Sequence, residues 1–257
     1  MKTRDFQKKV WNHYRKHGRH NLPWRKTQNP YRILVSEIML QQTQVDRVIP
    51  YYKNFLKLFP TPQALAKAKL ADVLRAWQGL GYNRRAKYLH EAASILVRHR
   101  VSHKVDWEEL PGVGPYTAKA VRVFAFNQPE VLIETNIRTV FLHEFFSKKK
   151  NITDTQLIRY IVSVSDEKNP RQWYWALMDY GSHLKKTSGN ANTRSKHYVK
   201  QTKFEGSLRQ ERGRLLRLLL VSPFRLKNSA DEKTKRAIQS LIKDGLVKKE
   251  KNSFYLR

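Results

Sequence analysis

The chain has 257 residues, 40% of them hydrophobic, which is enough for a buried core and one or two domains. Lys and Arg outnumber Asp and Glu by 51 to 21, and the net charge of +30 attracts polyanions and opposes self-association. We therefore expect a monomer whose partner is a nucleic acid. The absence of cysteine excludes disulfides, thiolate nucleophiles, cysteine-bound iron–sulfur clusters and cysteine zinc sites within these residues.

The first residues contain scattered charges and no apolar segment of signal-peptide length, and no stretch of about 18 apolar residues occurs. This pattern predicts an intracellular protein without a membrane partner, in the cytoplasm with the nucleoid or in the nucleus. Some basic chains are ribosomal or membrane-surface proteins. However, eleven Phe, twelve Tyr and six Trp are typical of a structured binder and not of a charged tail.

Helical patterns dominate the first hundred residues. Apolar residues at three- and four-residue steps predict helices from residue 30 to 59, divided or ended by Pro50 and Pro60. Thr61 and Pro62 are typical of a helix cap followed by a first-turn proline. The glycines of "GLGYNRRA" (79–86) predict a turn between two short helices.

Strand patterns are scarce before residue 245, so we predict a helical body. Residues 185–203 lack periodicity and indicate an extended basic linker. The last segment has two amphipathic helical patterns followed by "LVKKEKNSFYLR", which predicts a β-hairpin. Helix, helix and hairpin with basic edges resemble a winged-helix module that binds DNA or protein.

The segment 106–126 contains a short helical lead, the turn "LPGVG" and a helix that Pro115 opens. Glycines let a phosphate approach the free N–H groups at the positive end of a helix dipole. A plain helical corner is the commoner meaning of such a turn. The net charge of +30 favours a phosphate-binding hairpin here.

"LPGVGPYTAKAV" and the following "ETNIRTV" resemble the helix-hairpin-helix, Gly-Pro-Asp superfamily of DNA glycosylases. Four further segments resemble its MutY adenine DNA glycosylases, in order over about residues 20–184: "LPWR", "YRILVSEIMLQQTQV", "LAKAKLADVLRAWQGLGYNRRAKYLHEAA" and "LMDYGS". The resemblance implies an all-α fold of two helical subdomains, one a six-helix bundle and the other joining the N-terminal helix to residues after about 130.

The resemblance also implies catalytic roles. Glu37, on an apolar helix, corresponds to the acid that protonates the departing base, although pairing with an arginine is an alternative. Glu134 and Asn136 correspond to the sugar-facing carboxylate and its neighbour. Tyr116 stands where bifunctional relatives carry a Schiff-base lysine, so we expect no strong lyase activity, and Lys119 is predicted to point elsewhere on its helix.

DNA contacts are implied at further positions. Tyr82 corresponds to an aromatic wedge in the base stack, although packing on the core is an equal alternative. The full set of expected DNA-binding residues is Gln41, Gln42, Tyr82, Arg84, Gly112, Val113, Gly114, Thr117 and Arg138. His143, His183 and His197 have no partner at metal-ligand spacing, so we predict no metal site on side chains and no cofactor, whereas the hairpin carbonyls could hold a cation.

The chain departs from the family in three places. Glu134 replaces an aspartate, and a displacement of about 1 Å in a catalytic group can cost roughly a hundredfold in rate. After "LMDYGS" the family commonly has four cysteines for an iron–sulfur cluster, and this chain has none. About fifty residues follow the linker, in place of the family's larger α/β domain that inspects oxidised guanine.

We therefore predict three regions: a glycosylase domain (1–184), a basic linker (185–204) and a winged-helix-like module (205–257). The predicted function is monofunctional removal of a mispaired base from double-stranded DNA, with adenine opposite 8-oxoguanine or guanine as the first expectation. One alternative is removal of thymine or uracil from mispairs with guanine. The other is a non-catalytic binder of damaged DNA.

Overall fold

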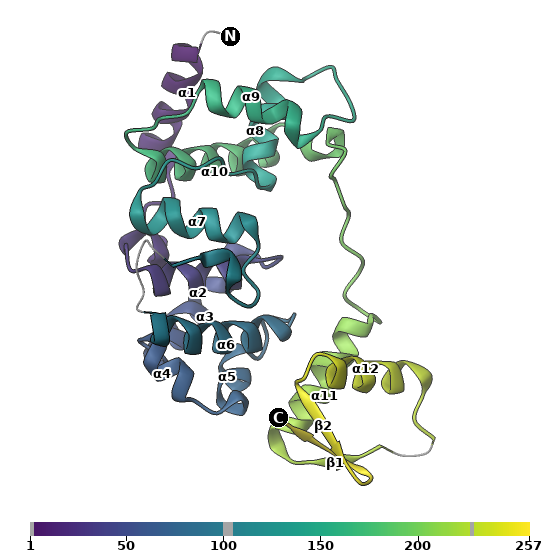
Figure 1. Ribbon diagram of the computed structural model, residues 1–257. Coiled ribbons are helices and arrows are strands. Elements are labelled where there is room, and N and C mark those ends of the chain that lie inside the picture. Colours follow the sequence, from purple (N-terminus) through teal and green to yellow (C-terminus); the bar gives the residue numbers. More distant parts are fainter. Residues whose placement is uncertain (1–2, 100–104, 227–228) are drawn as a thin grey trace. The chain divides into compact units, whose positions relative to one another are not determined.

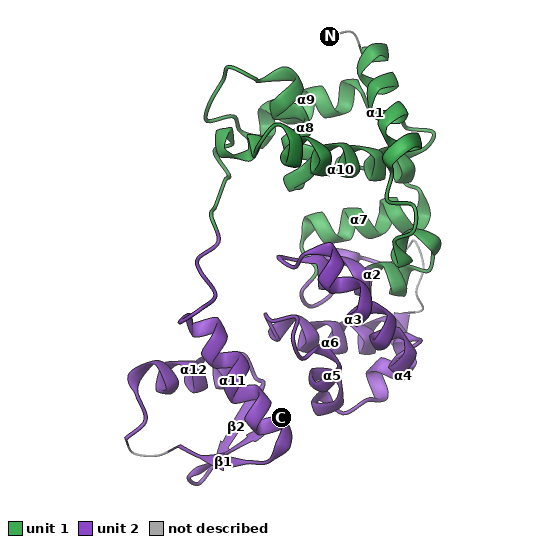
Figure 2. Cartoon of the chain, turned by 180° about the vertical axis from the view of Figure 1, so that it is seen from behind, with its two compact units in different colours: residues 1–33, 113–200 green, residues 34–112, 201–257 purple. Residues whose placement is uncertain are grey.

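The computed structural model describes residues 3–99, 105–226 and 229–257, and the chain divides into two compact units (Figures 1 and 2). Unit 1 comprises residues 1–33 and 113–200, and unit 2 comprises residues 34–112 and 201–257. The second segment of unit 1 thus begins at Val113, whereas the sequence predicts that the corresponding subdomain resumes near residue 130. None of the helices in these described ranges has the length and apolar character needed to cross a bilayer.

Unit 1 is helical. Its elements are α1 (Thr3–His17), η1 (Pro23–Lys26), α7 (Pro115–Phe126), α8 (Thr135–Phe145), α9 (Asp154–Ser163), α10 (Pro170–Thr187) and η3 (Ala191–Arg194). Helix α10 lies against α8 and α1. Phe6, Phe141 and Trp173 from these helices are at most 1% exposed and pack with their rings in contact, which forms the core of this unit.

Unit 2 contains a helical part and a small sheet. Its elements are α2 (Pro30–Leu40), whose first turn belongs to unit 1, α3 (Val45–Leu58), α4 (Pro62–Lys67), α5 (Leu70–Trp77), α6 (Arg84–His99), η2 (Trp107–Glu109), α11 (Leu208–Val221), β1 (Phe224–Arg225), α12 (Glu232–Lys243), β2 (Val247–Glu250) and β3 (Ser253–Leu256). The strands form an antiparallel sheet in the order β1-β3-β2. The helical body and the two-helix module with a β-hairpin confirm the predicted fold class.

Local signals act as predicted at several ends. The Thr61 side chain accepts a hydrogen bond from the Ala64 N–H, and Pro62 begins α4. Ser207 and Asp231 cap α11 and α12 in the same way, by accepting from backbone N–H groups. These contacts lie within one helical turn of each cap, which is why the sequence indicates them.

The prediction at Pro50 is wrong. Pro50 lies inside α3, and the break between α2 and α3 falls at residues 41–44, where Gln42 has a φ of 57°. A proline near a helix start removes one backbone hydrogen bond, and the buried Val48, Tyr52 and Phe55 hold α3 in place on both sides of it.

The first part of the predicted linker 185–204 is also not extended. Helix α10 continues to Thr187, and the buried Asn192 donates to the Thr135 carbonyl at 2.8 Å and to the Thr139 hydroxyl. Ile152 pairs with Ser195 in an isolated bridge. Because these contacts come from distant residues, the local composition of the segment does not indicate them.

A buried ion pair links two segments of unit 1 that are far apart in the chain. Asp179 of α10 binds the Arg25 guanidinium of η1 at 2.7 Å, and both side chains are at most 4% exposed. Arg19 donates to the same carboxylate at 2.6 Å. Burial raises the pKa of Asp179, but the bonds to Arg25 and the charges of Arg25 and Arg19 outweigh it and hold that pKa below its ordinary value.

We expect Asp179→Asn to lower the free energy of unfolding by about 3–5 kcal/mol, because it leaves the buried Arg25 without an anionic partner. Urea denaturation followed by circular dichroism measures this loss. The control is Asp72→Asn, which breaks an exposed pair with Arg75 and is expected to cost less than about 1 kcal/mol. Equal losses in the two variants would contradict a special role for the buried pair.

Candidate functional site

The carboxylate of Glu134 is fixed at the start of α8. Its Oε1 accepts hydrogen bonds from the backbone N–H of Asn136 at 2.8 Å and of Ile137 at 2.9 Å, and its Oε2 accepts from the Asn136 amide at 3.2 Å. Glu134 therefore caps the helix through its side chain, and its carboxylate lies at the start of α8.

The environment of Glu134 has opposing effects on its proton affinity. Burial raises the pKa of Glu134, whereas the hydrogen bonds from Asn136 and Ile137 and the Arg138 charge lower it, and burial prevails. The Glu134 oxygens act as acceptors in all three of these hydrogen bonds, as those of an ionised carboxylate do. The site thus holds a half-buried carboxylate at the positive end of a helix dipole.

A glycine of α10 allows the close approach of α8 at this site. A Cβ on Gly181 would lie 2.1 Å from the Asn136 carbonyl oxygen. Gly181 belongs to the "LMDYGS" segment, so this segment positions the helix start that carries Glu134 and Asn136.

Glu37 lies in unit 2, in the second half of α2. Its side chain is half-buried, and the neighbouring Ser36 and Ile38 are each 1% exposed. The Glu37 carboxyl group is therefore partly withdrawn from water.

The hairpin before α7 has the predicted local form. Gly112 has a φ of 77°, and a Cβ there would lie 2.7 Å from the Tyr88 side chain. Gly114 is the N-cap of α7 and Pro115 is its first residue. Gly112 and Gly114 are exposed, so the backbone of the turn is accessible to a ligand.

Two predicted DNA-binding residues near α7 are buried. Val113 is 6% and Thr117 is 4% exposed, which fits packing and argues against contact of either side chain with DNA. Tyr116, the position of the lysine in bifunctional relatives, is half-buried on α7. Lys119 lines a cavity of unit 1 with Glu130 and Tyr174.

Arg138 has a structural contact in unit 1. Its guanidinium makes two bonds of 2.8 Å to the Asp154 carboxylate at the start of α9. The Arg138 side chain is 15% exposed. The pair joins α8 to α9, and this role does not require DNA.

Four predicted DNA-binding residues of unit 2 line one pocket, namely Gln41, Gln42, Tyr82 and Arg84. Gln41 also approaches the hairpin, with its amide nitrogen 3.5 Å from the Gly112 carbonyl. Within this unit the structure thus brings the loop after α2 and the turn before α6 together at the pocket, and it places Gln41 next to Gly112. No group of three or more His, Asp or Glu side chains in the described part of the chain is placed to hold a metal ion.

Tyr82 differs from an exposed wedge. Its hydroxyl accepts hydrogen bonds from Arg209 and Gln201, both at 2.6 Å. The Arg85 and Arg209 guanidinium groups lie 5.5 and 5.4 Å from its ring centre. Tyr82 is half-buried in this arrangement and forms part of the pocket wall.

Sequence reasoning missed Arg85, which organises this wall. The buried guanidinium donates to the carbonyls of Ile38 and Gln41 at the end of α2, at 2.8 and 2.7 Å, and to that of Gly81 at 3.0 Å. Burial lowers the pKa of Arg85 to about 10. Arg85 thus ties the helix of Glu37 to the turn of Tyr82, and only the doubled arginine in "GYNRRA" hints at it.

We expect Arg85→Lys to lower the free energy of unfolding by about 2–3 kcal/mol. A single ammonium group cannot replace the guanidinium nitrogens, which donate hydrogen bonds to carbonyls on both segments. Thermal or urea denaturation measures the loss. Arg84→Lys is the matched control, since Arg84 is 55% exposed and pairs with Asp244 at the surface. If both substitutions cost the same, the structural role of Arg85 is refuted.

Comparisons with known proteins agree with these observations. Residues 35–164 match the model of the HhH-GPD superfamily base excision DNA repair proteins. An adenine DNA glycosylase of Mycobacterium tuberculosis is 49% identical over 125 residues, which are 47% of this chain and 41% of that protein. One from Buchnera aphidicola is 35% identical over 187 residues, 71% of this chain and 53% of that protein. The chain spans about half the length of these curated relatives.

Solved structures show the same fold. A thermostable thymine-DNA glycosylase superposes with a TM-score of 0.61 at 24% identity, over 70% of this chain and 86% of that chain. Endonuclease III in a non-covalent DNA complex gives 0.60 at 15% identity, over 73% and 89%.

Proposed function

The chain belongs to the HhH-GPD superfamily of base excision DNA repair proteins, and we propose that it is a monofunctional DNA glycosylase that removes a mispaired adenine from duplex DNA. The observation that carries this proposal is the Glu134 carboxylate, held at the α8 N-terminus by two backbone N–H groups. The longer Glu side chain places its carboxylate on the N–H groups at the start of α8, which supports activity with Glu in place of Asp.

In the proposed reaction, Glu37 protonates the base as the bond between the base and C1′ of the sugar breaks. Protonation makes the leaving group neutral. A water molecule supplies the hydroxyl group that joins C1′, and its proton leaves to a base or to solvent. The products are the free base and an abasic site.

Glu134 stabilises the positive charge that develops on the sugar during bond breaking, with Asn136 holding its second oxygen. Tyr116 supplies no amine at the sugar side, so no Schiff base forms and the strand remains intact. Gln41, Gln42 and Arg84 contact the DNA from unit 2, together with the accessible backbone at Gly112 and Gly114.

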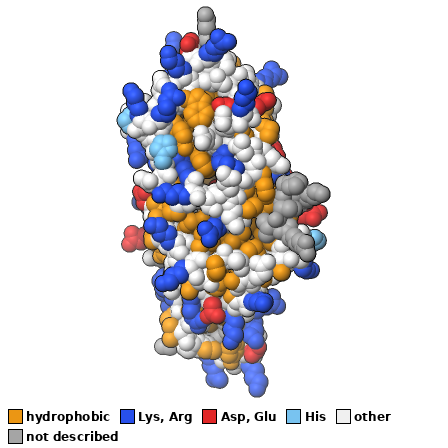
Figure 3. All heavy atoms as spheres, turned by 90° about the vertical axis from the view of Figure 1, so that its left-hand side faces the viewer, with side chains coloured by type: hydrophobic (Ala, Val, Ile, Leu, Met, Phe, Trp, Pro, Cys, Tyr) orange, Lys and Arg blue, Asp and Glu red, His pale blue; other side chains and the backbone are white. Residues whose placement is uncertain are grey.

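Adenine is proposed as the base because relatives that are 49% and 35% identical to this chain are adenine DNA glycosylases. The opposing base is proposed to be 8-oxoguanine or guanine. The net charge of +30 favours duplex DNA as the partner, and Lys and Arg side chains are distributed over the face shown in Figure 3.

Single-turnover assays on A:8-oxoG, A:G, T:G, U:G and hypoxanthine-containing duplexes test this proposal. We expect release of adenine, with strand breakage only after alkali. Excision confined to T:G and U:G would replace adenine by thymine or uracil. Tight binding without excision on any duplex would instead establish a non-catalytic binder.

A further inference from the structure

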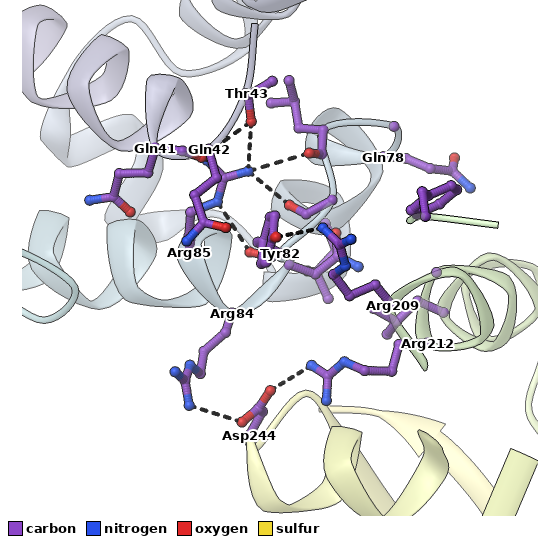
Figure 4. A pocket seen from close by; sticks show the side chains of 18 of the residues that line it. Gln41, Gln42, Thr43, Gln78, Tyr82, Arg84, Arg85, Arg209, Arg212 and Asp244 are labelled. Carbon is purple, nitrogen blue, oxygen red and sulfur yellow. Dashed lines mark hydrogen bonds and ion pairs between the residues drawn. The ribbon is translucent and has the colours of Figure 1, made fainter. Parts of the chain in front are cut away.

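The pocket of unit 2 extends beyond the residues expected from the family. It has a volume of about 910 Å³ and is lined by the loop after α2, the turn before α6, and residues of the C-terminal segment from Gln201 to Asp244 (Figure 4). The C-terminal part of the lining lies outside residues 35–164, which match the superfamily. Its contribution to binding is therefore not implied by that match.

The charge of the pocket selects an anion. Six arginines line it and only one acid does. That acid, Asp244, is bound by Arg84 at 3.2 Å and Arg212 at 2.5 Å, so it neutralises part of the charge. Arg47 and Arg217 are exposed lining residues, which places positive charge where a phosphate in solvent can reach it.

The uncharged polar side chains of the pocket are suited to a ligand with hydrogen-bonding groups besides a phosphate. Five glutamines line the pocket, namely Gln41, Gln42, Gln44, Gln78 and Gln201. An amide both donates and accepts hydrogen bonds, as the edge of a nucleobase requires. An inorganic anion would engage the arginines, whereas the exposed amides of Gln42, Gln44 and Gln78 are also able to bind the edge of a base.

Phe204 supplies a stacking surface. Its side chain lines the pocket and is 60% exposed. Tyr82, in contrast, has guanidinium groups over its ring. Phe204 is therefore the aromatic ring of the pocket that a base can cover, and stacking on such rings is tolerant of sequence.

We propose that the C-terminal segment completes a pocket for one unstacked nucleotide of DNA. The base stacks on Phe204 and its edge meets the glutamine amides, while Arg47 and Arg217 bind the flanking phosphates. The proposal rests on the proposed function for the identity of the polymer. It assigns to residues outside the superfamily match a direct part in recognising distorted DNA.

Fluorescence titrations with the full chain test this proposal. The probe is a matched duplex that carries one unpaired 2-aminopurine nucleotide, and the reference is the same duplex with 2-aminopurine paired with thymine. We expect the unpaired probe to bind about tenfold more tightly and its fluorescence to be quenched by stacking. Phe204→Ala should remove the quenching and the preference.

Exposed residues outside the pocket provide matched controls. Tyr198→Ala removes a 40% exposed aromatic and should leave the preference and quenching unchanged. Arg217→Ala should weaken binding of the unpaired probe more than Arg236→Ala, which removes the same charge from the exposed surface of α12.

Two results would overturn the proposal: equal affinity of the unmodified chain for both duplexes, or a Phe204→Ala variant that keeps the preference. Neither measurement requires base excision. A chain that excises no base but prefers the unpaired probe would refute the glycosylase proposal alone, and a chain that excises bases without this preference would refute the pocket alone.

Discussion

Glu37→Gln is expected to lower the single-turnover rate of base excision by about a thousandfold while leaving DNA affinity within a factor of about two. Gln has the shape of Glu but no acidic proton. The departing base then leaves as an anion, which is a poorer leaving group than the neutral base. Because the position is half-buried on α2, the neutral amide adds no desolvation cost and the fold should persist.

Quenched-flow or manual single-turnover assays with saturating enzyme measure this rate, and fluorescence anisotropy with an uncleavable duplex measures affinity. Asp46→Asn is the control, since it removes an exposed acid from the first turn of α3. The control should excise at the unmodified rate. A Glu37→Gln variant that retains more than about a tenth of the activity would rule out Glu37 as the acid.

Glu134→Gln is expected to lower the excision rate by roughly 100- to 1000-fold. Gln preserves the side-chain length and keeps one oxygen for the Asn136 and Ile137 N–H groups, but it removes the negative charge that is proposed to stabilise the sugar. The helix cap is thus retained and the electrostatic stabilisation is lost. Glu167→Gln, an exposed substitution, controls for the loss of one acid.

The pH dependence gives Glu134 a second signature. Burial raises the pKa of Glu134 above its ordinary value of 4.5. As the pH is lowered, the excision rate should therefore decrease with a midpoint above 4.5, because the carboxylate takes up a proton. The variant should lack this acidic limb. Full activity in Glu134→Gln, or an unchanged acidic limb, would remove Glu134 from the mechanism.

The same shift predicts the effect on stability. A folded-state pKa above the unfolded one favours the protonated form, so the group stabilises the fold at low pH and this contribution is lost as the pH rises through the raised pKa. At pH 8 the neutral Gln variant should therefore be at least as stable as the unmodified chain. Urea denaturation at pH 8 checks this, and it separates loss of activity from loss of folding.

The sequence by itself determined the helical class and several helix ends, and it indicated Glu37 and Glu134 as the candidate catalytic carboxylates. Thr61, Pro62, Gly112 and Pro115 act on neighbours within a few residues, and such short-range effects are readable from spacing. The resemblance of ordered motifs then indicated the superfamily, and the match over residues 35–164 confirms it.

Only the tertiary structure decided how distant segments support these residues. Asp179 binds Arg25 across 154 positions of the chain, and Arg85 joins two segments around the helix of Glu37. It also decided that Arg209 covers Tyr82 and that Arg138 binds Asp154. A charged side chain in a sequence can meet any opposite charge or carbonyl, and only the packing of buried neighbours selects which one it meets.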